Sequence, residues 1–592
     1  MARRKTRRSG RGRTERSRRS GQAKRGRGAT ARNGRAHRLI PTAVLQKTHK
    51  AVRPLFRAGI GLDQFFSKAK ALTERQRARI VDQAMILLEG FYAHLPLKRA
   101  MYAVDPLQGL RRLRQRLPLM KSDRSFHAEM ISIFASVCDL HTNYVLPAPY
   151  KDAQAWLPFK IESYFDRGRR RYIVTHIAPG FAKLSFRKGV ELLYWNGIPI
   201  ARAVEMAGAQ SGANSPAARH AYGLLNLTAR PLKMLPPPDE EWVVVRYRTR
   251  RGREQEIQFD WVVTEFPLGA AVVNRRNRSN QTEYMRQISK FLFAQDVVDS
   301  EKKIAAASDP RSLVKGTDSF MPDIFRARAV RTPHGKVGYI RIFSFDVDDP
   351  EALVSEFFRL ITERLPQSGL IIDVRDNGGG SSLAAESLLQ FISPHRPIVP
   401  QRLYFINTAR TLRLCQLQKS NLREGPRGLL PWIESIQRAM ETSAMYSASF
   451  PSHDEKVLNA IGRRYPARYP GPTIVITNAV SYSATEFFAA GFQDHGGKVL
   501  GVDNVTGGGG ANVRTHTELR KYYKNASNSP FKGLPKGAEL RVAFRRSQRV
   551  GPQIGNDVED FGITPDYFYK MTRDDLLKGN VDLINHAASL LV

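Results

Sequence analysis

Residues 472–486, with the sequence PTIVITNAVSYSATE, place a serine between a predicted strand and a predicted helix. The β-branched run at residues 473–477 is typical of a short strand buried on both faces of a sheet. Helical apolar spacing begins at Ala484, and Glu486 falls in the first turn, where the helix dipole favours an acid. Ser483 therefore lies where a turn exposes a hydroxyl and a helix N-terminus can stabilise an oxyanion, as a serine nucleophile requires. A serine before a helix is also a common N-cap, and this stretch alone leaves both interpretations open.

A histidine that could act as a general base follows another predicted helix. Asp123 is expected to cap this helix, whose apolar stripe consists of Phe126, Met130, Ile133, Phe134 and Val137. The helix leads into the polar turn Cys138-Asp139-Leu140-His141-Thr142. An imidazole titrates near neutral pH, so His141 could move a proton, or its ring could simply satisfy a local carbonyl.

A glycine-rich loop follows a predicted strand, helix and strand at residues 337–343, 350–365 and 370–374. This order indicates a largely parallel sheet with a right-handed crossover. The loop reads RDNGGG at residues 375–380, and glycines at the end of a strand let backbone N–H groups approach a ligand. A phosphate loop is disfavoured, because the Gly-Lys-Ser or Gly-Lys-Thr ending of that motif is missing.

Two further loops follow the predicted serine helix. Residues 506–510 read TGGGG, after a predicted strand at residues 499–502. Residues 558–566 read VEDFGITPD and bring Glu559 into an acidic loop that Gly and Pro close. Taken alone, this acidic loop could equally be a solvated surface turn.

The chain divides by composition and pattern into several regions. Residues 1–40 hold 16 basic residues against the single acid Glu15, with almost nothing apolar, and predict a disordered basic tail. Residues 41–150 predict a helical domain, in which Thr73 caps one helix. Residues 155–265 alternate as strands and form a β-rich module, with a turn at Asn196-Gly197. Residues 266–333 predict a connector, and residues 396–470 an insertion without a recognisable motif.

Composition limits the function classes. The chain has 592 residues, with 94 Lys and Arg against 54 Asp and Glu, so its tail could be a solvated segment or could bind nucleic acid or an anionic surface. Cys138 and Cys415 stand far apart, which argues against a disulfide framework or a zinc site. No apolar segment follows the N-terminal arginines as in a secretory signal, and no apolar run approaches the roughly 18 residues of a membrane span. We therefore expect a cytoplasmic protein.

In their order along the chain, these parts resemble the S41 family of serine peptidases, which includes C-terminal processing proteases, the tricorn core and the chlamydial protease-like factor. The resemblance covers most of residues 75–570. It rests on GLIIDVRDNGGG at 369–380 and SYSATEFFAAGFQDHG at 481–496. The stretch GVELLYWNG at 189–197 is similar to a motif of the family's PDZ domain.

The resemblance implies a fold and a nucleophile. The expected fold is a multidomain α/β (α+β) arrangement: a helical N-terminal region, a PDZ-like module at 155–265 and a ClpP/crotonase-like α/β catalytic core at 334–592. The nucleophile would be Ser483, three residues before Glu486. The backbone N–H groups of Gly379 and Ala484 would form the oxyanion hole.

The resemblance also implies the base. One branch of the family uses a lysine in a loop equivalent to residues 506–510, which has no lysine here, and Lys498 comes too early. The tricorn-like branch uses a His ahead of the PDZ domain and a late Glu, which correspond to His141 and Glu559. Leu140 stands where tricorn has a serine, so a direct contact between Glu559 and His141 is expected. His495 is rejected as a base because it would lie roughly 18 Å along the helix from Ser483.

The expected function is that of a serine endopeptidase acting on proteins or peptides, with no cofactor and no metal. The main alternative is a catalytically inactive S41-like protein that binds peptides through its PDZ-like module. A third possibility, a nucleic-acid-associated protein led by the basic tail, predicts binding that weakens with salt. An oligomer is compatible with the sequence.

Overall fold

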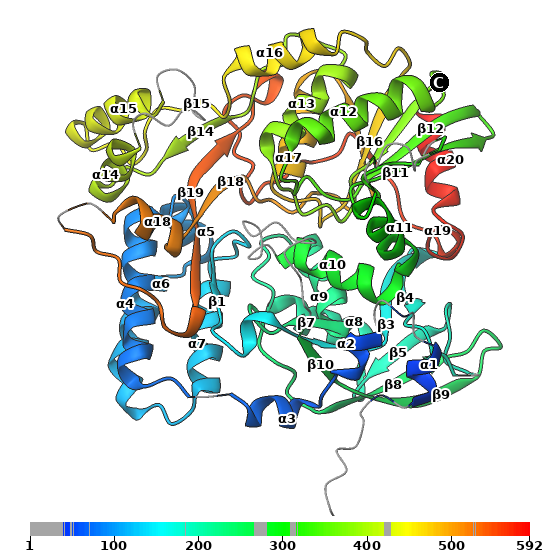
Figure 1. The fold of residues 1–592 in the computed structure, drawn as a ribbon, viewed down its shortest axis with the longest axis horizontal. Helices are drawn as coiled ribbons and strands as arrows, with labels where there is room; N and C mark the ends of the chain where they lie inside the picture. Colours follow the sequence, from blue (N-terminus) through cyan, green and yellow to red (C-terminus); the bar gives the residue numbers. More distant parts are fainter. Residues whose placement is uncertain are drawn as a thin grey trace, which may run out of the picture. The chain divides into compact units, whose positions relative to one another are not determined.

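A computed structural model describes residues 40, 42–47, 50, 53–69, 71–183, 185–265, 281–307, 309, 315–316, 318–418, 428–524, 526 and 528–592 (Figure 1). Contacts group Leu39–Val592 as one unit and Met1–Arg38 as another. The predicted basic tail, apart from Ile40, lies outside the described residues. The described part is a mixed α/β, multidomain arrangement, as the sequence predicted.

The N-terminal region is helical. Its helices are α1 (Thr42–Lys47), α2 (Arg53–Arg57), α3 (Leu62–Ser67), α4 (Glu74–Phe91), α5 (Leu95–Tyr102), α6 (Pro106–Arg116) and α7 (Asp123–Ala135). Thr73 caps α4 as predicted, its hydroxyl accepting from the N–H of Gln76. The predicted cap of α7 was one residue off, because the Ser122 hydroxyl accepts from the first-turn N–H groups while Asp123 pairs with Arg77 at 2.6 Å.

The β-rich module is built on an antiparallel sheet in the order β3 (Phe159–Asp166), β4 (Arg169–Ile177), β5 (Glu191–Trp195), β8 (Trp242–Arg248) and β9 (Glu254–Asp260). The short β6 (Ile198–Pro199) pairs with β5, and α8 (Ile200–Ala209) and α9 (Pro216–Thr228) follow. Asn196 and Gly197 have positive φ angles of 47° and 76°, which confirms the predicted turn. A small sheet of β10 (Val262–Glu265), β2 (Ala153–Trp156) and β7 (Ala229–Pro231) adjoins it in sequence.

The C-terminal region contains a six-stranded sheet in the order β11 (Phe325–Thr332), β12 (Gly335–Ile342), β13 (Leu370–Asp373), β16 (Thr473–Thr477), β17 (Lys498–Gly501) and β20 (Tyr567–Phe568). All neighbours from β12 onward are parallel, whereas β11 is antiparallel to β12. On one face lie α12 (Pro350–Arg359), α13 (Ser382–Ile392) and α17 (Ala484–Asp494), and on the other α19 (Arg573–Leu577) and α20 (Val581–Ser589) (Figure 1). The central strands β13 and β16 are buried on both faces, and for β16 the β-branched run predicted this.

The residues expected to form a plain connector at 266–333 contain α10 (Gln281–Phe293), α11 (Gln295–Ala305) and the edge strand β11. β11 was not foreseen, because in FRARAVRT the alternate residues are arginine, as suits an edge strand with one exposed face.

A second mixed region joins distant parts of the chain. Its sheet has the order β1 (Asn143–Val145), β19 (Glu539–Gln548), β14 (Arg402–Phe405) and β15 (Phe450–Pro451), and β18 (Ala511–Thr515) also pairs with β19. The insertion at 396–470 thus supplies β14 and β15, together with α14 (Ala409–Leu417), α15 (Leu430–Glu441) and α16 (Glu455–Arg464). The remaining helix is α18 (His516–Tyr522), and shorter helical turns occupy Leu117–Leu119, Tyr150–Asp152, Leu360–Arg364, Pro535–Gly537 and Gly551–Gln553.

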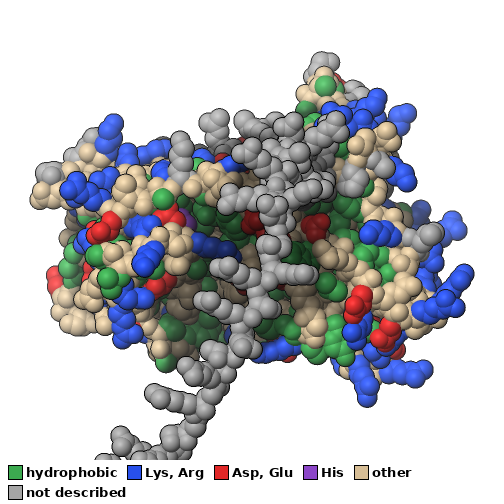
Figure 2. Space-filling model, turned by 90° about the horizontal axis from the view of Figure 1, so that it is seen from below, with side chains coloured by type: hydrophobic (Ala, Val, Ile, Leu, Met, Phe, Trp, Pro, Cys, Tyr) green, Lys and Arg blue, Asp and Glu red, His purple; other side chains and the backbone are tan. Residues whose placement is uncertain are grey.

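The positive charge extends beyond the tail. Among the coloured side chains on the face shown in Figure 2, Lys and Arg predominate over Asp and Glu. Among the described residues, no helix is both long and apolar enough to cross a membrane.

Candidate active site

Ser483 occupies the turn between β16 and α17, as the sequence predicted. Its backbone has φ 61° and ψ −124°, a conformation that a non-glycine residue adopts at a cost of about 1–3 kcal/mol. Hydrogen bonds hold the turn: the Tyr482 N–H donates to Asn377 O at 3.0 Å, and the Ser483 N–H donates to Glu486 Oε2 at 3.1 Å. The strained turn leaves Ser483 half-buried, so its hydroxyl is placed as a strand-to-helix nucleophile requires.

His141 lies directly against this hydroxyl. Its Nε2 is 3.0 Å from Ser483 Oγ, and only 1% of the residue is exposed. The turn that carries it is fixed by Asp139, whose carboxylate accepts from the His141 N–H at 2.7 Å and from Thr142 Oγ1 at 2.8 Å. Residues 342 positions apart in sequence are therefore brought into hydrogen-bond contact.

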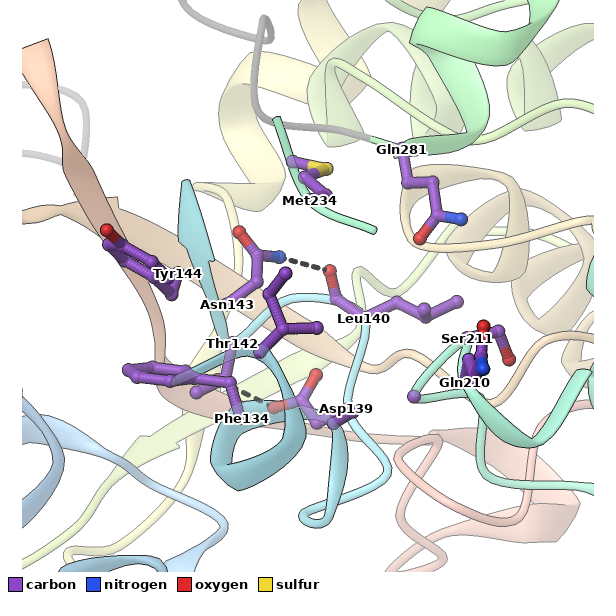
Figure 3. A pocket seen from close by; sticks show the side chains of 13 residues that line it. Phe134, Asp139, Leu140, Thr142, Asn143, Tyr144, Gln210, Ser211, Met234 and Gln281 are labelled. Carbon is purple, nitrogen blue, oxygen red and sulfur yellow. Dashed lines mark hydrogen bonds between the residues drawn. The ribbon is translucent and has the colours of Figure 1, made fainter. Parts of the chain in front are cut away.

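The same turn borders a small cavity of about 30 Å³ (Figure 3). The side-chain amide of Asn143 donates to Leu140 O at 2.9 Å on its wall. Leu140, where tricorn-like peptidases have a serine, is itself buried.

The electrostatic surroundings keep His141 neutral. Burial, with the positive charges of Arg541 and Lys98, holds the pKa of His141 well below its usual value of 6.5. A neutral ring that accepts the Ser483 proton at Nε2 carries its own proton on Nδ1. That Nδ1 lies 3.2 Å from the Tyr482 hydroxyl, and the two rings pack with centroids 4.6 Å apart. In the tautomer that this proton transfer requires, the Tyr482 hydroxyl is the acceptor for the Nδ1 proton.

Glu559 does not fill that position. Its Oε1 lies 2.8 Å from Lys98 Nζ, and its Oε2 lies 3.6 Å from His94 Nε2. Among the described residues, Glu559 forms neither an ion pair nor a hydrogen bond with His141. The expected direct contact is thus absent from this structure, because the Tyr482 hydroxyl occupies Nδ1 and the Lys98 ammonium attracts the carboxylate.

Glu559 belongs to a fully buried ionic cluster behind His141. Lys98 Nζ also lies 2.6 Å from Asp560 Oδ1 and donates to Cys138 O at 3.1 Å. Burial alone would lower the pKa of Lys98, but the charges of Glu559, Asp560 and Asp139 outweigh it and raise that pKa. Burial, followed by the charge of Asp139, raises the pKa of Glu559 well above its usual range. One ammonium thus lies against two carboxylates, those of Glu559 and Asp560.

His94, Asp139 and Glu559 offer ligand atoms within 4.8 Å of one another, a spacing that could suit a metal ion. The Lys98 ammonium already supplies a positive charge at 2.8 Å from Glu559. The cluster therefore has a cation of its own, and its geometry does not require a metal.

The two predicted oxyanion donors differ in the structure. Gly379 has φ 95°, and a Cβ added there would come within 2.7 Å of both Ala484 N and Ser483 Cβ, so only glycine allows this approach. The Gly379 N–H, however, donates to Asn377 Oδ1 at 2.9 Å. The Ala484 N–H has no acceptor among the described residues and remains available beside the nucleophile.

Glu486 links the nucleophile turn to the TGGGG loop. Its carboxylate accepts from Thr506 Oγ1 at 2.5 Å and from the N–H groups of Gly508 and Gly509 at 2.7 Å. Burial outweighs these hydrogen bonds and raises its pKa to about 7. The loop lacks a lysine, and its glycines instead admit Tyr482, since a Cβ on Gly509 would lie 2.0 Å from that ring.

The two residues rejected as bases lie away from the nucleophile. His495 Nε2 accepts from the N–H of Val399 at 2.9 Å, and its Nδ1 lies 2.7 Å from Gly491 O. Lys498 is exposed and pairs with Asp566 at 3.1 Å.

The sequence analysis missed Tyr482, Lys98 and His94. Tyr482 had a signal, because it precedes the serine and the chain offers a run of glycines that an aromatic ring could pack against. Lys98 and His94 had none, since their burial depends on contacts with residues more than 400 positions away.

Comparisons with known proteins identify the domains and the fold. Residues 336–568 match peptidase family S41, and residues 153–267 match the PDZ domain. No curated protein sequence matches the chain. Among solved structures, mature CPAF is 17% identical with a TM-score of 0.60, covering 88% of this chain and 97% of its own. Mature CPAF complexed with lactacystin is 16% identical with a TM-score of 0.58, covering 88% and 98%.

At these identities the structural likeness concerns the fold, and the sequence matches supply the family. The PDZ match spans the antiparallel sheet of β3, β4, β5, β8 and β9, and the peptidase match begins at β12 and ends at β20. Residues 336–568 therefore form a domain of peptidase family S41, and residues 153–267 form a PDZ domain.

Proposed function

We propose that this protein is a serine endopeptidase that hydrolyses peptide bonds of proteins or peptides, with Ser483 as nucleophile and His141 as base. The observation that carries the proposal is the 3.0 Å contact between His141 Nε2 and Ser483 Oγ at a strained strand-to-helix turn. In a family S41 fold, such a pair suits acyl transfer.

The chemistry follows from the positions of the atoms. His141 takes the Ser483 proton at Nε2 while Oγ attacks the carbonyl carbon, and the same nitrogen returns the proton to the leaving amine. The free N–H of Ala484, at the N-terminus of α17, stabilises the oxyanion. The Gly379 N–H becomes the second donor when it leaves its acceptor, Asn377 Oδ1, and donates to the oxyanion instead. Water then attacks the acyl-enzyme by the same route.

Glu559 acts in this proposal through its charge. Burial and the charges of Asp139 and Glu559 raise the pKa of Tyr482 well above 10.0, which favours the protonated hydroxyl. In this proposal the oxygen of that hydroxyl accepts from His141 Nδ1. The carboxylate of Glu559 offsets the positive charge of Lys98, which otherwise disfavours the imidazolium that forms during the reaction. Ser483, His141 and Glu559 thus remain the proposed triad, with Tyr482 as the direct partner of His141 Nδ1.

The alternative, an inactive peptide-binding protein, rests on two features of the site. The Gly379 N–H is occupied, and Glu559 does not contact His141. Both features are compatible with a site that does not turn over.

A serine-directed fluorophosphonate and the hydrolysis of casein test the proposal. We expect the wild-type chain to be labelled and active, and Ser483→Ala and His141→Ala to lose both. His334→Ala, which changes an exposed histidine in the turn between β11 and β12, should behave like wild type. A folded wild-type chain that neither reacts with the probe nor cleaves casein would favour the inactive alternative.

A further inference from the structure

A large cleft lies between the PDZ sheet, α10 and the catalytic sheet. Its volume is about 530 Å³. Lys160 and Glu162 of β3 line one side, and Arg326, Arg328 of β11 and Arg341 of β12 line another. The cleft is therefore open to a segment that contacts the PDZ domain and the catalytic domain together.

One end of the cleft reaches the turn before the nucleophile. Asp376 and Val480 both line it. The side chain of Asn478 joins them, because it donates to Asp376 Oδ1 at 2.8 Å and accepts from the Val480 N–H at 3.2 Å. The cleft thus reaches Val480, which precedes the nucleophile Ser483 by three residues in the sequence.

The carboxylates in the wall of the cleft already have partners. Glu162 pairs with Lys160 at 3.3 Å, and Asp376 pairs with Arg341 at 3.2 Å. Asp323 binds Arg286 at 2.7 Å. The fourth, Asp575, caps α19 and accepts from the N–H groups of Thr572 and Leu583.

Three cations of the wall lack such neutralisation. Among the described residues, Lys188 and Arg328 have no carboxylate within ion-pair distance, and Arg326 has only the exposed Asp296 at 3.9 Å. Arg328 donates instead to Gly579 O at 3.4 Å. The cleft therefore carries an excess of positive charge that its own acids do not cancel.

The arginines are also held in place. Arg328 lies over the Tyr339 ring at 5.2 Å, and Arg326 lies over the Phe343 ring at 5.9 Å. Stacking on a ring leaves the edge of a guanidinium free, and that edge matches the two oxygens of a carboxylate. Apolar side chains such as Phe293 and Val297 complete the wall.

We propose that this cleft binds acidic segments of the substrate, with glutamate or aspartate side chains on Arg326, Arg328 and Lys188. The inference rests on the proposed peptidase function, and it gives the enzyme a preference for substrates with acidic residues near the cleavage site. It concerns recognition, so it can be measured without turnover.

Binding of fluorescent peptides to full-length Ser483→Ala tests it. One peptide is unstructured and carries several glutamates, and its twin carries glutamine at the same positions. We expect the glutamate peptide to bind more tightly at low salt, with the preference shrinking as salt rises. The double change Arg326→Gln with Arg328→Gln should lower the affinity for the glutamate peptide by roughly tenfold or more and leave the affinity for the glutamine peptide unchanged.

Arg331→Gln is the matched control, because Arg331 is an exposed arginine on the same strand but outside the cleft. It should leave both peptides unaffected. Equal binding of the twins, or a glutamate preference that survives the double change, would overturn the inference. The inference would also be overturned if an oligonucleotide bound through the same arginines while the two peptides bound equally, because the cleft would then be a nucleic-acid site. Failure of the peptidase proposal shows separately, as absent probe labelling of the wild-type chain.

Discussion

Tyr482→Phe removes one oxygen atom and tests whether the pairing with His141 belongs to the working site. In the structure, Tyr482 Oη is the hydrogen-bond partner of His141 Nδ1 at 3.2 Å. Phenylalanine keeps the ring packing against His141 but leaves the buried Nδ1–H without an acceptor. An unsatisfied buried N–H costs about 1–3 kcal/mol, so kcat/KM should fall by roughly 5- to 150-fold.

The assay is the hydrolysis rate of a fluorogenic peptide at low substrate, which reports kcat/KM, with fluorophosphonate labelling alongside. Tyr523→Phe is the control, since Tyr523 is also buried and its hydroxyl donates to Arg410 O at 2.7 Å, away from the site. Wild-type kcat/KM in Tyr482→Phe would refute the reasoning. If Glu559→Gln then lost several orders of magnitude, Glu559 would contact His141 directly during turnover, as the family resemblance implies.

The remaining predictions concern packing, charge and pH. Gly509→Ala should abolish activity and destabilise the fold by about 1–3 kcal/mol, measured by thermal denaturation and peptide hydrolysis, because its Cβ would lie 2.0 Å from the Tyr482 ring. Lys98→Met should cost about 3–5 kcal/mol of stability in urea unfolding, because it leaves Glu559 buried without its cation, and a stable variant would contradict the ion-pair assignment. Since the pKa of His141 lies well below 6.5, kcat/KM should hold at pH 6.5 and decline only in more acid solution. The unfolded chain binds more protons at this residue between the folded pKa and 6.5, so stability should also fall as pH drops through that window.

The elements around the nucleophile could be predicted because each has a local signal. The bounds of β16 and the first residue of α17 agree with the sequence to the residue, since a β-branched run and a helical apolar period are both set by near neighbours. The contact between Ser483 and His141 depended on the family resemblance, because spacing alone cannot place residues 342 positions apart.

The sequence could not predict which residue is the hydrogen-bond partner of His141 Nδ1. Nothing in the order of residues says whether Tyr482 or Glu559 contacts His141, because the answer depends on a buried cation from α5 that competes for the carboxylate. β11 was missed for a related reason: Arg326 and Arg328 line a cleft that exists only once three separate regions have assembled.

One strand, β19, holds three loops of the site. Its Ala543 N–H donates to Thr142 Oγ1 at 3.0 Å, next to His141. At its other end, the Ser547 N–H donates to Gly510 O at 3.0 Å, and Ser547 O accepts from the Val558 N–H at 3.2 Å, next to Glu559. The His turn, the glycine loop and the acidic loop thus take their relative positions from a single strand.

The same strand carries the insertion. β14, from residues 402–405, pairs with β19 over Arg545 to Gln548, which includes the residue that holds the glycine and acidic loops. A change that loosens β14 would therefore first shift Ser547. The nucleophile turn would respond later, because its own hydrogen bonds come from Asn377 and Glu486. The insertion and the catalytic geometry are coupled through the acidic and glycine loops, and Glu486, which accepts from both the glycine loop and the Ser483 N–H, extends this coupling to the nucleophile turn.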